Sequence, residues 1–498
     1  MRTKVSVIGS GFSSMVAACC LAQQGVEVDI YEKNDGPGGR ASYFEADGFC
    51  FDMGPSWYWM PEVFENFFNK FGKKASDFYD LVQLDPGYQV FFINDEPVKI
   101  PASKNELFDL FESIESGSAE KLDQFLKEAE YKYRVGMDEY VWKPGRSVTE
   151  FMDVKVLKSF TKLQMLSSVT KAVHSLFTDH RLRQILEFPV LFLGSMPNRI
   201  PALYTLMNHA DLSLGTWYPK GGMYKVTEAF YTLAVSLGVK FHFNMPIDAV
   251  KIQQRKITAL ISGGQEIPTD FIINGSDYHH FDKEILPEEF SNYSSSYWES
   301  REMAPSSLLF YLGIDREVPG LEHHNLFFDS DFKTHASEIY ETKVWPSDPL
   351  FYICAPSKTD VNCAPSGCEN LFALIPIAPG LKEDKALHDK YLAEIIRRIK
   401  LKTGVDISAN IIFKKSFSIS DFKSRYNAFK GNAYGLANTL KQTAVLKPKF
   451  YSKKLDNLYH TGQLTVPGPG MPPAIVSGQL VAEQFLERHK IKTNGQLI

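Results

Sequence analysis

The sequence lacks the cysteine patterns that build metal or disulfide frameworks. It holds six cysteines among 498 residues, and none forms a C-x-x-C pair or combines with histidines at zinc-site spacing. Only Cys363 and Cys368, five positions apart, suggest a disulfide; reduced thiols in a reducing compartment fit better. Positive charge is not in excess either: 54 Lys and Arg stand against 59 Asp and Glu, which argues against nucleic acid as a partner.

Long uninterrupted apolar runs are also missing. A membrane-spanning helix needs about 20 consecutive apolar residues. The longest stretch without a charged side chain, residues 457–482, contains four prolines, so it does not predict an ordinary spanning helix. Arg2, Lys4 and the apolar residues that follow resemble a signal peptide only superficially, because a strand, a glycine turn and a helix explain them better.

That strand, turn and helix form a nucleotide-binding pattern. Residues 5–8 are β-prone and end in Gly9-Ser10-Gly11, after which apolar residues recur at helical spacing. A second β-prone run, residues 26–30, ends at Glu32, 21 positions beyond Gly11. This order of strand, glycine turn, helix, strand and acid predicts a βαβ dinucleotide site.

The residue types explain how such a site works. Glycines allow a pyrophosphate to sit against the helix N-terminus, where free N–H groups and the positive end of the helix dipole receive its charge. Glu32 would accept hydrogen bonds from ribose hydroxyls. Ser14 occupies the third glycine position of the fingerprint, and we expect this small residue to permit close packing of helix and strand, with some loss of closeness.

A second glycine pair, Gly38-Gly39, is followed by Arg40, and then by a segment that ends in Gly54-Pro55-Ser56. Paired glycines permit close backbone approach, and an arginine suits a phosphate or a flavin carbonyl. A surface turn is the alternative explanation. With these residues in place, the sequence resembles the two-domain flavoproteins of the amine oxidase and carotenoid desaturase superfamily, in which such a segment holds FAD.

The resemblance covers residues 5–485 and is greatest to the bacterial-type phytoene desaturases. It is carried by the glycine motifs, by residues 196–204, 355–368 and 421–433, and by residues 457–478. It implies an α/β fold with a discontinuous Rossmann-type FAD-binding domain (1–90, 218–290 and 432–498). An inserted α+β substrate domain (91–217 and 291–431) would carry a helical, membrane-facing segment.

The same resemblance implies a set of cofactor-binding residues. In the C-terminal stretch, Gln463 is uncharged and Val466 stands where relatives commonly carry histidine, so we assign no imidazole there. The strand near Ile247 would approach the adenine. The full set is Gly9, Ser10, Gly11, Phe12, Ser13, Glu32, Lys33, Gly38, Gly39, Arg40, Gly54, Pro55, Ser56, Ile247, Gly462, Gln463, Gly470 and Met471.

The activity implied is repeated dehydrogenation of phytoene, a long apolar polyene, toward lycopene or neurosporene. Such a substrate offers nothing polar to grip, so it needs a long apolar channel. Aromatic residues between 57 and 68 suit a channel and core packing equally well. The resemblance suggests Glu150 as a proton acceptor, although an exposed, solvated acid is the better interpretation.

A bilayer-resident substrate also implies peripheral attachment to the inner, cytoplasmic face of the membrane, with quinone or oxygen as electron acceptor. Residues 188–207 carry one charge, on Arg199, and are either a buried helix or a surface that dips into lipid. His279-His280 and His323-His324 show no third ligand, and we expect no metal. The alternatives are a 3,4-desaturase of hydroxycarotenoids, a diapophytoene desaturase, a carotenoid isomerase, and a non-catalytic binding protein of this fold.

Overall fold

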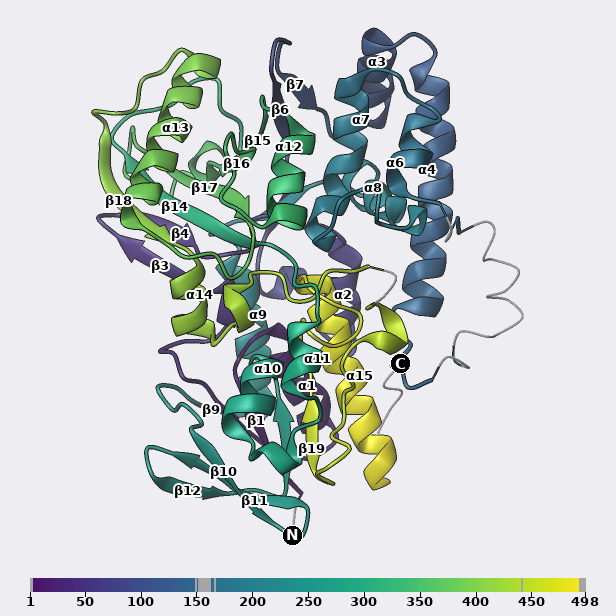
Figure 1. The fold of residues 1–498 in the computed structure, drawn as a ribbon, viewed down its shortest axis with the longest axis vertical. Coiled ribbons are helices and arrows are strands. Elements are labelled where there is room, and N and C mark those ends of the chain that lie inside the picture. Colours follow the sequence, from purple (N-terminus) through teal and green to yellow (C-terminus); the bar gives the residue numbers. More distant parts are fainter. Residues whose placement is uncertain (1–2, 148–149, 151–162, 165–166, 440–441, 492–498) are drawn as a thin grey trace.

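The computed structural model describes residues 3–147, 150, 163–164, 167–439 and 442–491. Two large sheets organise the chain, and Figure 1 shows one in its lower and one in its upper part. The lower sheet is parallel and the upper one mostly antiparallel. The α/β class predicted from the sequence is therefore confirmed.

The lower sheet contains the predicted βαβ unit at its centre. Every neighbouring pair of its strands runs parallel. Segments far apart in the sequence thus lie side by side, with a middle strand between a late one and an early one. In spatial order the strands are β19 (Leu458–His460), β13 (Phe271–Asn274), β1 (Lys4–Ile8), β2 (Glu27–Tyr31) and β9 (Lys240–His242).

Helix α1 (Phe12–Gln23) lies between this sheet and two other helices, α9 (Tyr224–Ser236) and α15 (Met471–His489). Its residues 12–21 are all buried. Contact with α15 is unusually close, because a Cβ placed on Gly478 would lie 2.4 Å from the Ser13 carbonyl oxygen. The helix that follows the glycine turn is therefore fixed on every side, which fixes the position of the turn.

The upper sheet has one face on a helix and the other on the cavity described below. Tyr391 and Ile395 of α13 (Lys385–Thr403) pack in the same core cluster as Leu308 and Phe310. In spatial order its strands are β18 (Ile411–Phe417), β14 (Ser306–Ile314), β17 (Glu369–Ile377), β16 (Phe351–Cys354), β15 (His324–Phe328), β6 (Tyr88–Phe92) and β7 (Val98–Ile100). The limits of the two domains stay a prediction.

A group of helices stands beside the upper sheet (Figure 1). At its start, the Ser103 hydroxyl caps the first helix by accepting from the Glu106 N–H. The helices are α3 (Lys104–Ile114), α4 (Ser118–Val135), α6 (Val169–His174), α7 (His180–Glu187) and α8 (Leu206–Leu212).

The segment 188–207 passes between these helices and the cavity. Phe188, Val190 and Ile200 are buried, and none of its apolar side chains that the structure describes is exposed. Its apolar side chains thus pack inside the protein, and contact of this segment with lipid stays a prediction. Among the described residues, no helix is long and apolar enough to cross a membrane.

Smaller elements complete the fold, and none of the six cysteines is in a disulfide. The short sheets are β3 (Tyr43–Ala46) with β4 (Phe49–Asp52), β5 (Leu81–Gln83) with β8 (Trp217–Pro219), and β10 (Ala249–Gln253), β11 (Lys256–Ser262) and β12 (Gln265–Pro268). Further short helices are α2 (Pro61–Asn69), α12 (Phe332–Ser337) and α14 (Ile419–Tyr426).

Candidate functional site

A cavity of about 870 Å³ is lined by residues of both large sheets. One part of its wall is polar and rich in glycine, and the other is apolar and aromatic. The structure brings together on this wall every residue that the sequence analysis assigns to the cofactor: Gly9, Ser10, Gly11, Phe12, Ser13, Glu32, Lys33, Gly38, Gly39, Arg40, Gly54, Pro55, Ser56, Ile247, Gly462, Gln463, Gly470 and Met471.

The glycine turn after β1 opens the N-terminus of α1 to the cavity. Gly9 has φ +84°, a left-handed conformation that favours glycine, and its N–H donates to the Tyr31 carbonyl. Gly11 precedes α1, and no side chain caps the helix there. The first N–H groups of α1 are thus free of a capping side chain, as an anion site requires.

Ser14 at the third glycine position has its counterpart in Gly275. A Cβ on Gly275 would lie 1.9 Å from the Ser14 hydroxyl oxygen, so the close approach of strand and helix depends on a glycine in β13's C-terminal turn. The absence of a side chain at Gly275 therefore compensates for the larger residue at Ser14, and helix and strand still pack closely. Sequence reasoning missed Gly275 because its partner is 261 positions away.

The second glycine pair packs on the first turn. Gly38, with φ +108°, donates its N–H to the Ser10 carbonyl, and a Cβ on Gly39 would lie 3.6 Å from the Gly11 Cα. A Cβ on Gly54 would approach the Arg40 carbonyl oxygen to 2.4 Å. A main-chain oxygen thus leaves no room for a Cβ at Gly54, and Gly38 has a left-handed backbone; together with Gly39 they line the cavity with main chain.

Glu32 is buried and its carboxylate is held rigidly. One oxygen accepts from the Ser10 N–H and hydroxyl, both at 2.8 Å, and the other accepts from the N–H and amide of Asn34 at 2.9 and 2.7 Å. The carbonyl of Glu32 accepts from the Met245 N–H, which holds the segment that carries Ile247 against the cavity. This arrangement suits recognition of ribose hydroxyls near an adenine.

Arg40 supplies the positive charge in this part of the wall. Its Nη2 donates to the Asn432 carbonyl at 3.3 Å, whereas its buried Nε has no partner among the described residues. Burial lowers the pKa of Arg40, and the nearby Asp277 carboxylate opposes that shift. An unsatisfied guanidinium N–H beside a helix N-terminus fits an anionic group such as a pyrophosphate.

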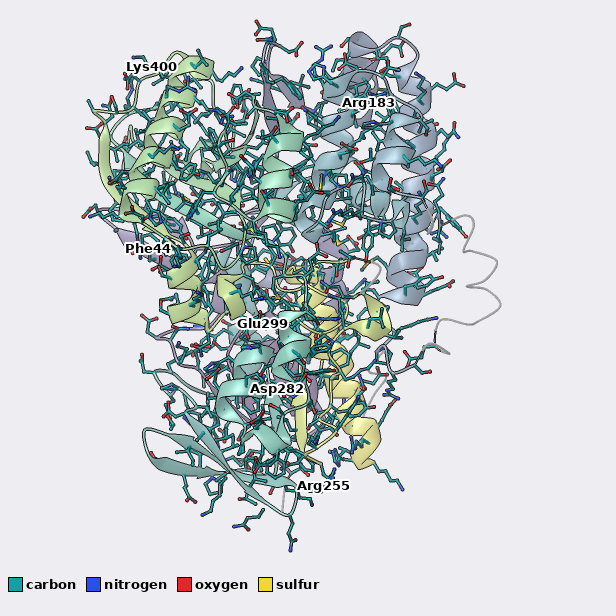
Figure 2. The ribbon with its side chains drawn as sticks, viewed as in Figure 1. Phe44, Arg183, Arg255, Asp282, Glu299 and Lys400 are labelled. Carbon is teal, nitrogen blue, oxygen red and sulfur yellow. The ribbon has the colours of Figure 1, made fainter. Side chains whose placement is uncertain are left out.

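Asp277 lines the same wall, and no sequence motif pointed to it. It accepts from the His280 N–H at 3.0 Å, and burial raises its pKa while Arg40 opposes that shift. The segment that follows is anchored by Asp282, labelled in Figure 2, which accepts from Trp298 Nε1 and from the Asn292 N–H. Phe281 of this segment also lines the cavity.

The late part of the chain adds a second helix N-terminus. Gly470, with φ +113°, precedes α15, and Met471 is its first residue. The Gly462 N–H donates to the Ser477 hydroxyl, which ties the loop before α15 to the helix itself. Both loops line the cavity, as the resemblance implies for a closing stretch of the cofactor site.

The rest of the wall is apolar and is formed largely by the upper sheet. Of the aromatic residues predicted between 57 and 68, three line the cavity, whereas Tyr58, Phe67 and Phe68 pack in the core. The segment 188–207 contributes as well. The apolar lining includes Trp57, Trp59, Met60, Phe64, Phe188, Leu191, Leu193, Leu309, Leu326, Phe328, Phe372 and Leu374.

Ionisable groups are few in the apolar part. His335 is buried, its Nδ1 accepts from the Leu350 N–H and its Nε2 donates to the Pro376 carbonyl, so both nitrogens are used. Burial lowers its pKa to about 4. The acids among the cavity residues (Glu32, Asp248, Asp277 and Glu284) all belong to segments of the polar part.

Glu150 is not among the residues that line the cavity. Its carboxylate accepts from the Arg146 N–H at 3.1 and 3.2 Å, and the residue is half-buried. Its role as a proton acceptor stays a prediction.

The two histidine pairs differ in their surroundings. His279 stacks on Phe429 at 3.8 Å and belongs to a helical turn. For His323 and His324 the sequence shows no third ligand, but the structure brings Cys354 to them. That ligand was missed because it lies on the neighbouring strand, 30 positions from His324.

Comparisons with known proteins agree with this geometry. Residues 13–486 match the family described as flavin containing amine oxidoreductase. A carotenoid 3,4-desaturase of Haloarcula japonica is 39% identical over 97% of this chain and 98% of its own. A zeta-carotene-forming phytoene desaturase of Myxococcus xanthus is 30% identical over 97% and 94%. A 4,4'-diapophytoene desaturase of Staphylococcus aureus is 30% identical over 97% and 99%.

Solved structures share the fold at low sequence identity. Putrescine oxidase bound to putrescine superposes with a TM-score of 0.60 at 13% identity, over 98% of this chain and all of its own. An oxidoreductase of Methanosarcina mazei gives 0.61 at 15% identity, over 97% and 100%. With the relatives and the cavity together, the chain belongs to the flavin containing amine oxidoreductases, and within them to the FAD-dependent carotenoid desaturases.

Proposed function

We propose that the protein desaturates phytoene, with FAD bound along the glycine-lined part of the cavity and the polyene in the apolar part. The observation that carries the proposal is the division of one cavity into these two parts. Gly9, Gly11, Glu32 and Arg40 would hold the dinucleotide, and the loops at Gly462 and Gly470 would hold the remainder of the cofactor. When bound, FAD supplies a hydride acceptor.

The chain's own contribution is mainly positioning. Carboxylates are missing from the described residues of the apolar part, and His335 uses both ring nitrogens. Burial raises the pKa of Tyr340 and Tyr352, so these hydroxyls stay protonated at neutral pH. An apolar wall orients a hydrocarbon by shape and excludes water from the reacting carbons. Loss of a hydride must be followed by loss of a proton from a neighbouring carbon, and we assign none of the described residues of the apolar part as its acceptor.

A second candidate is desaturation of a carotenoid that already carries a polar end group. The 39% identical relative, named as a carotenoid 3,4-desaturase, favours it. Hydroxyl groups do lie on the wall of the apolar part, on Tyr340 and Tyr434. They would give a polar end group a hydrogen-bond partner, which phytoene does not need.

The test is product analysis with the flavin-containing enzyme. Purified protein is supplied with liposomes that contain either phytoene or a hydroxylated carotenoid, with a quinone or oxygen as acceptor, and pigments are separated by chromatography. Coloured products from phytoene support the proposal, whereas turnover of the hydroxylated substrate alone selects the second candidate. Sedimentation with the same liposomes tests the proposed attachment to the inner face of the membrane.

A further inference from the structure

We propose that His323, His324 and Cys354 form a binding site for one zinc ion. One donor atom from each residue lies within 4.8 Å of the other two. All three side chains are buried, with exposed fractions of 4%, 0% and 3%. The three ligand residues are not among those that line the flavin and polyene cavity, but the two sites are adjacent, because Trp57 of the cavity wall stacks on His324 at 4.1 Å.

The backbone fixes the three ligands relative to one another. His324 and Cys354 are direct partners across the β15–β16 ladder, so their side chains leave the same face of the sheet. His323 precedes β15, and its carbonyl accepts from the Ala355 N–H at 2.8 Å, next to Cys354. A two-strand support of this kind is more rigid than a loop and suits a metal site.

The hydrogen bonds leave one nitrogen of each ring available. His323 Nδ1 contacts the Thr359 hydroxyl at 2.7 Å, and His324 Nδ1 contacts the Tyr352 hydroxyl at 2.6 Å. Both Nε2 atoms are buried and have no partner in the part of the chain that the structure describes. Metal-bound histidines have this pattern, in which the second nitrogen is held by a neighbour and the first binds the ion.

A small chamber adjoins two of the three ligands. It has a volume of about 20 Å³ and is lined by Asp52, Ser56, His323 and Cys354 among others. This is room for about one water-sized occupant. The Asp52 carboxylate, which accepts from the Met223 and Tyr224 N–H groups, adds negative charge that favours a cation.

Two imidazoles and a thiol form a ligand set that suits zinc, and a water molecule in the chamber would take the fourth, tetrahedral position. Donor atoms around tetrahedral zinc lie about 3 to 4 Å apart, so movements of about 1 Å would complete the site. Binding forms one Zn–S bond and two Zn–N bonds and releases the proton of the Cys354 thiol to solvent.

The experiment measures zinc in the flavin-containing protein. Wild-type protein is stripped with a chelator, dialysed against Zn²⁺ and then against metal-free buffer, and its metal content is measured by mass spectrometry. About one zinc per chain is expected. Cys354→Ser and His324→Gln should each lose it. Cys363→Ser and His335→Gln change a neighbouring buried cysteine and another buried histidine, and should keep it.

X-ray absorption spectroscopy of the wild-type zinc protein provides a test that does not depend on whether a variant folds. One sulfur and two imidazole nitrogens around zinc are expected. The proposal is overturned if wild-type protein retains no stoichiometric zinc, if the zinc has no sulfur neighbour, or if well-folded Cys354→Ser and His324→Gln proteins both retain it. Water alone in the chamber would give the first of these results.

Discussion

The polar part of the cavity is built from main chain, whereas the apolar part is built from side chains. Around Gly9, Gly38 and Gly54 the backbone itself forms the wall, and an added methyl group would meet another backbone within a few ångströms. Around Leu326 and Phe328 the wall consists of side chains on one face of β15. A wall of main chain tolerates almost no substitution, whereas a wall of side chains can be reshaped one residue at a time.

This comparison is tested most severely at Gly38, where we expect the largest effect. Alanine there has an unfavourable φ of +108° and a Cβ within 2.7 Å of the Ala41 carbonyl oxygen and 2.8 Å of Thr227 Cγ2. Gly38→Ala should weaken flavin binding by about 4 kcal/mol, close to a thousandfold, as measured from flavin content and titration.

The matched control is Gly25→Ala. Gly25 has a similar φ of +81°, but a Cβ there would meet no atom within 4 Å. The variant should lose about 1 to 2 kcal/mol of stability and keep its flavin. Equal flavin binding by Gly38→Ala and wild type would contradict the idea of a main-chain wall.

Glu32→Gln tests the charge in the polar part. The four donors around the carboxylate cannot all be satisfied by an amide, so we expect flavin affinity to fall by about 3 kcal/mol. Glu27→Gln, at the exposed start of the strand that Glu32 follows, should change it by less than about 0.5 kcal/mol. Similar losses in both variants, measured by titration with FAD, would show that net charge rather than the Glu32 site matters.

In the apolar part of the cavity, His335 should make the stability of the protein depend on pH. Its pKa is lowered by burial to about 4, below the unfolded value of 6.5. The unfolded chain therefore binds the proton first, and stability is lost as the pH falls from about 6.5 toward 4. By about pH 5 the loss from this group is about 2 kcal/mol.

Urea unfolding of wild type and His335→Gln at about pH 7 and about pH 5 measures this contribution. Glutamine keeps a donor and an acceptor but does not titrate in this range, so the variant should lose about 2 kcal/mol less than wild type between the two pH values. An identical pH dependence of the two proteins would exclude the predicted role of His335.

Leu326→Asn should have the smallest effect, confined to the substrate. An amide in the apolar wall should reduce polyene affinity by about 1.5 kcal/mol, roughly tenfold in KM, with flavin content unchanged. Phe327→Leu is the control, because the Phe327 side chain leaves the opposite face of β15 and packs in the core cluster that also contains Leu308 and Phe310. It should lower the melting temperature and leave KM as it is. A loss of flavin from Leu326→Asn would break the separation of the two parts.

The same division explains what could be predicted from the sequence. The polar part depends on local requirements: Gly9, Gly11 and Glu32 are readable because turn, helix and acid follow each other within one βαβ unit. The apolar part depends on which strand faces which, so Leu326 and Leu374 resemble any other core leucine. Gly275, Asp277 and Cys354 were missed for the same reason, since their partners are distant in the sequence.

The placement of α15 against α1, and of β19 in the same sheet as β1, has a consequence for synthesis on the ribosome. More than 400 residues are translated between the glycine turn and the helix that closes over it. Until α15 has been synthesised, α1 is not covered by it, and the emerging chain exposes hydrophobic surface that chaperones recognise. Cofactor loading is therefore expected to be a late, post-translational event.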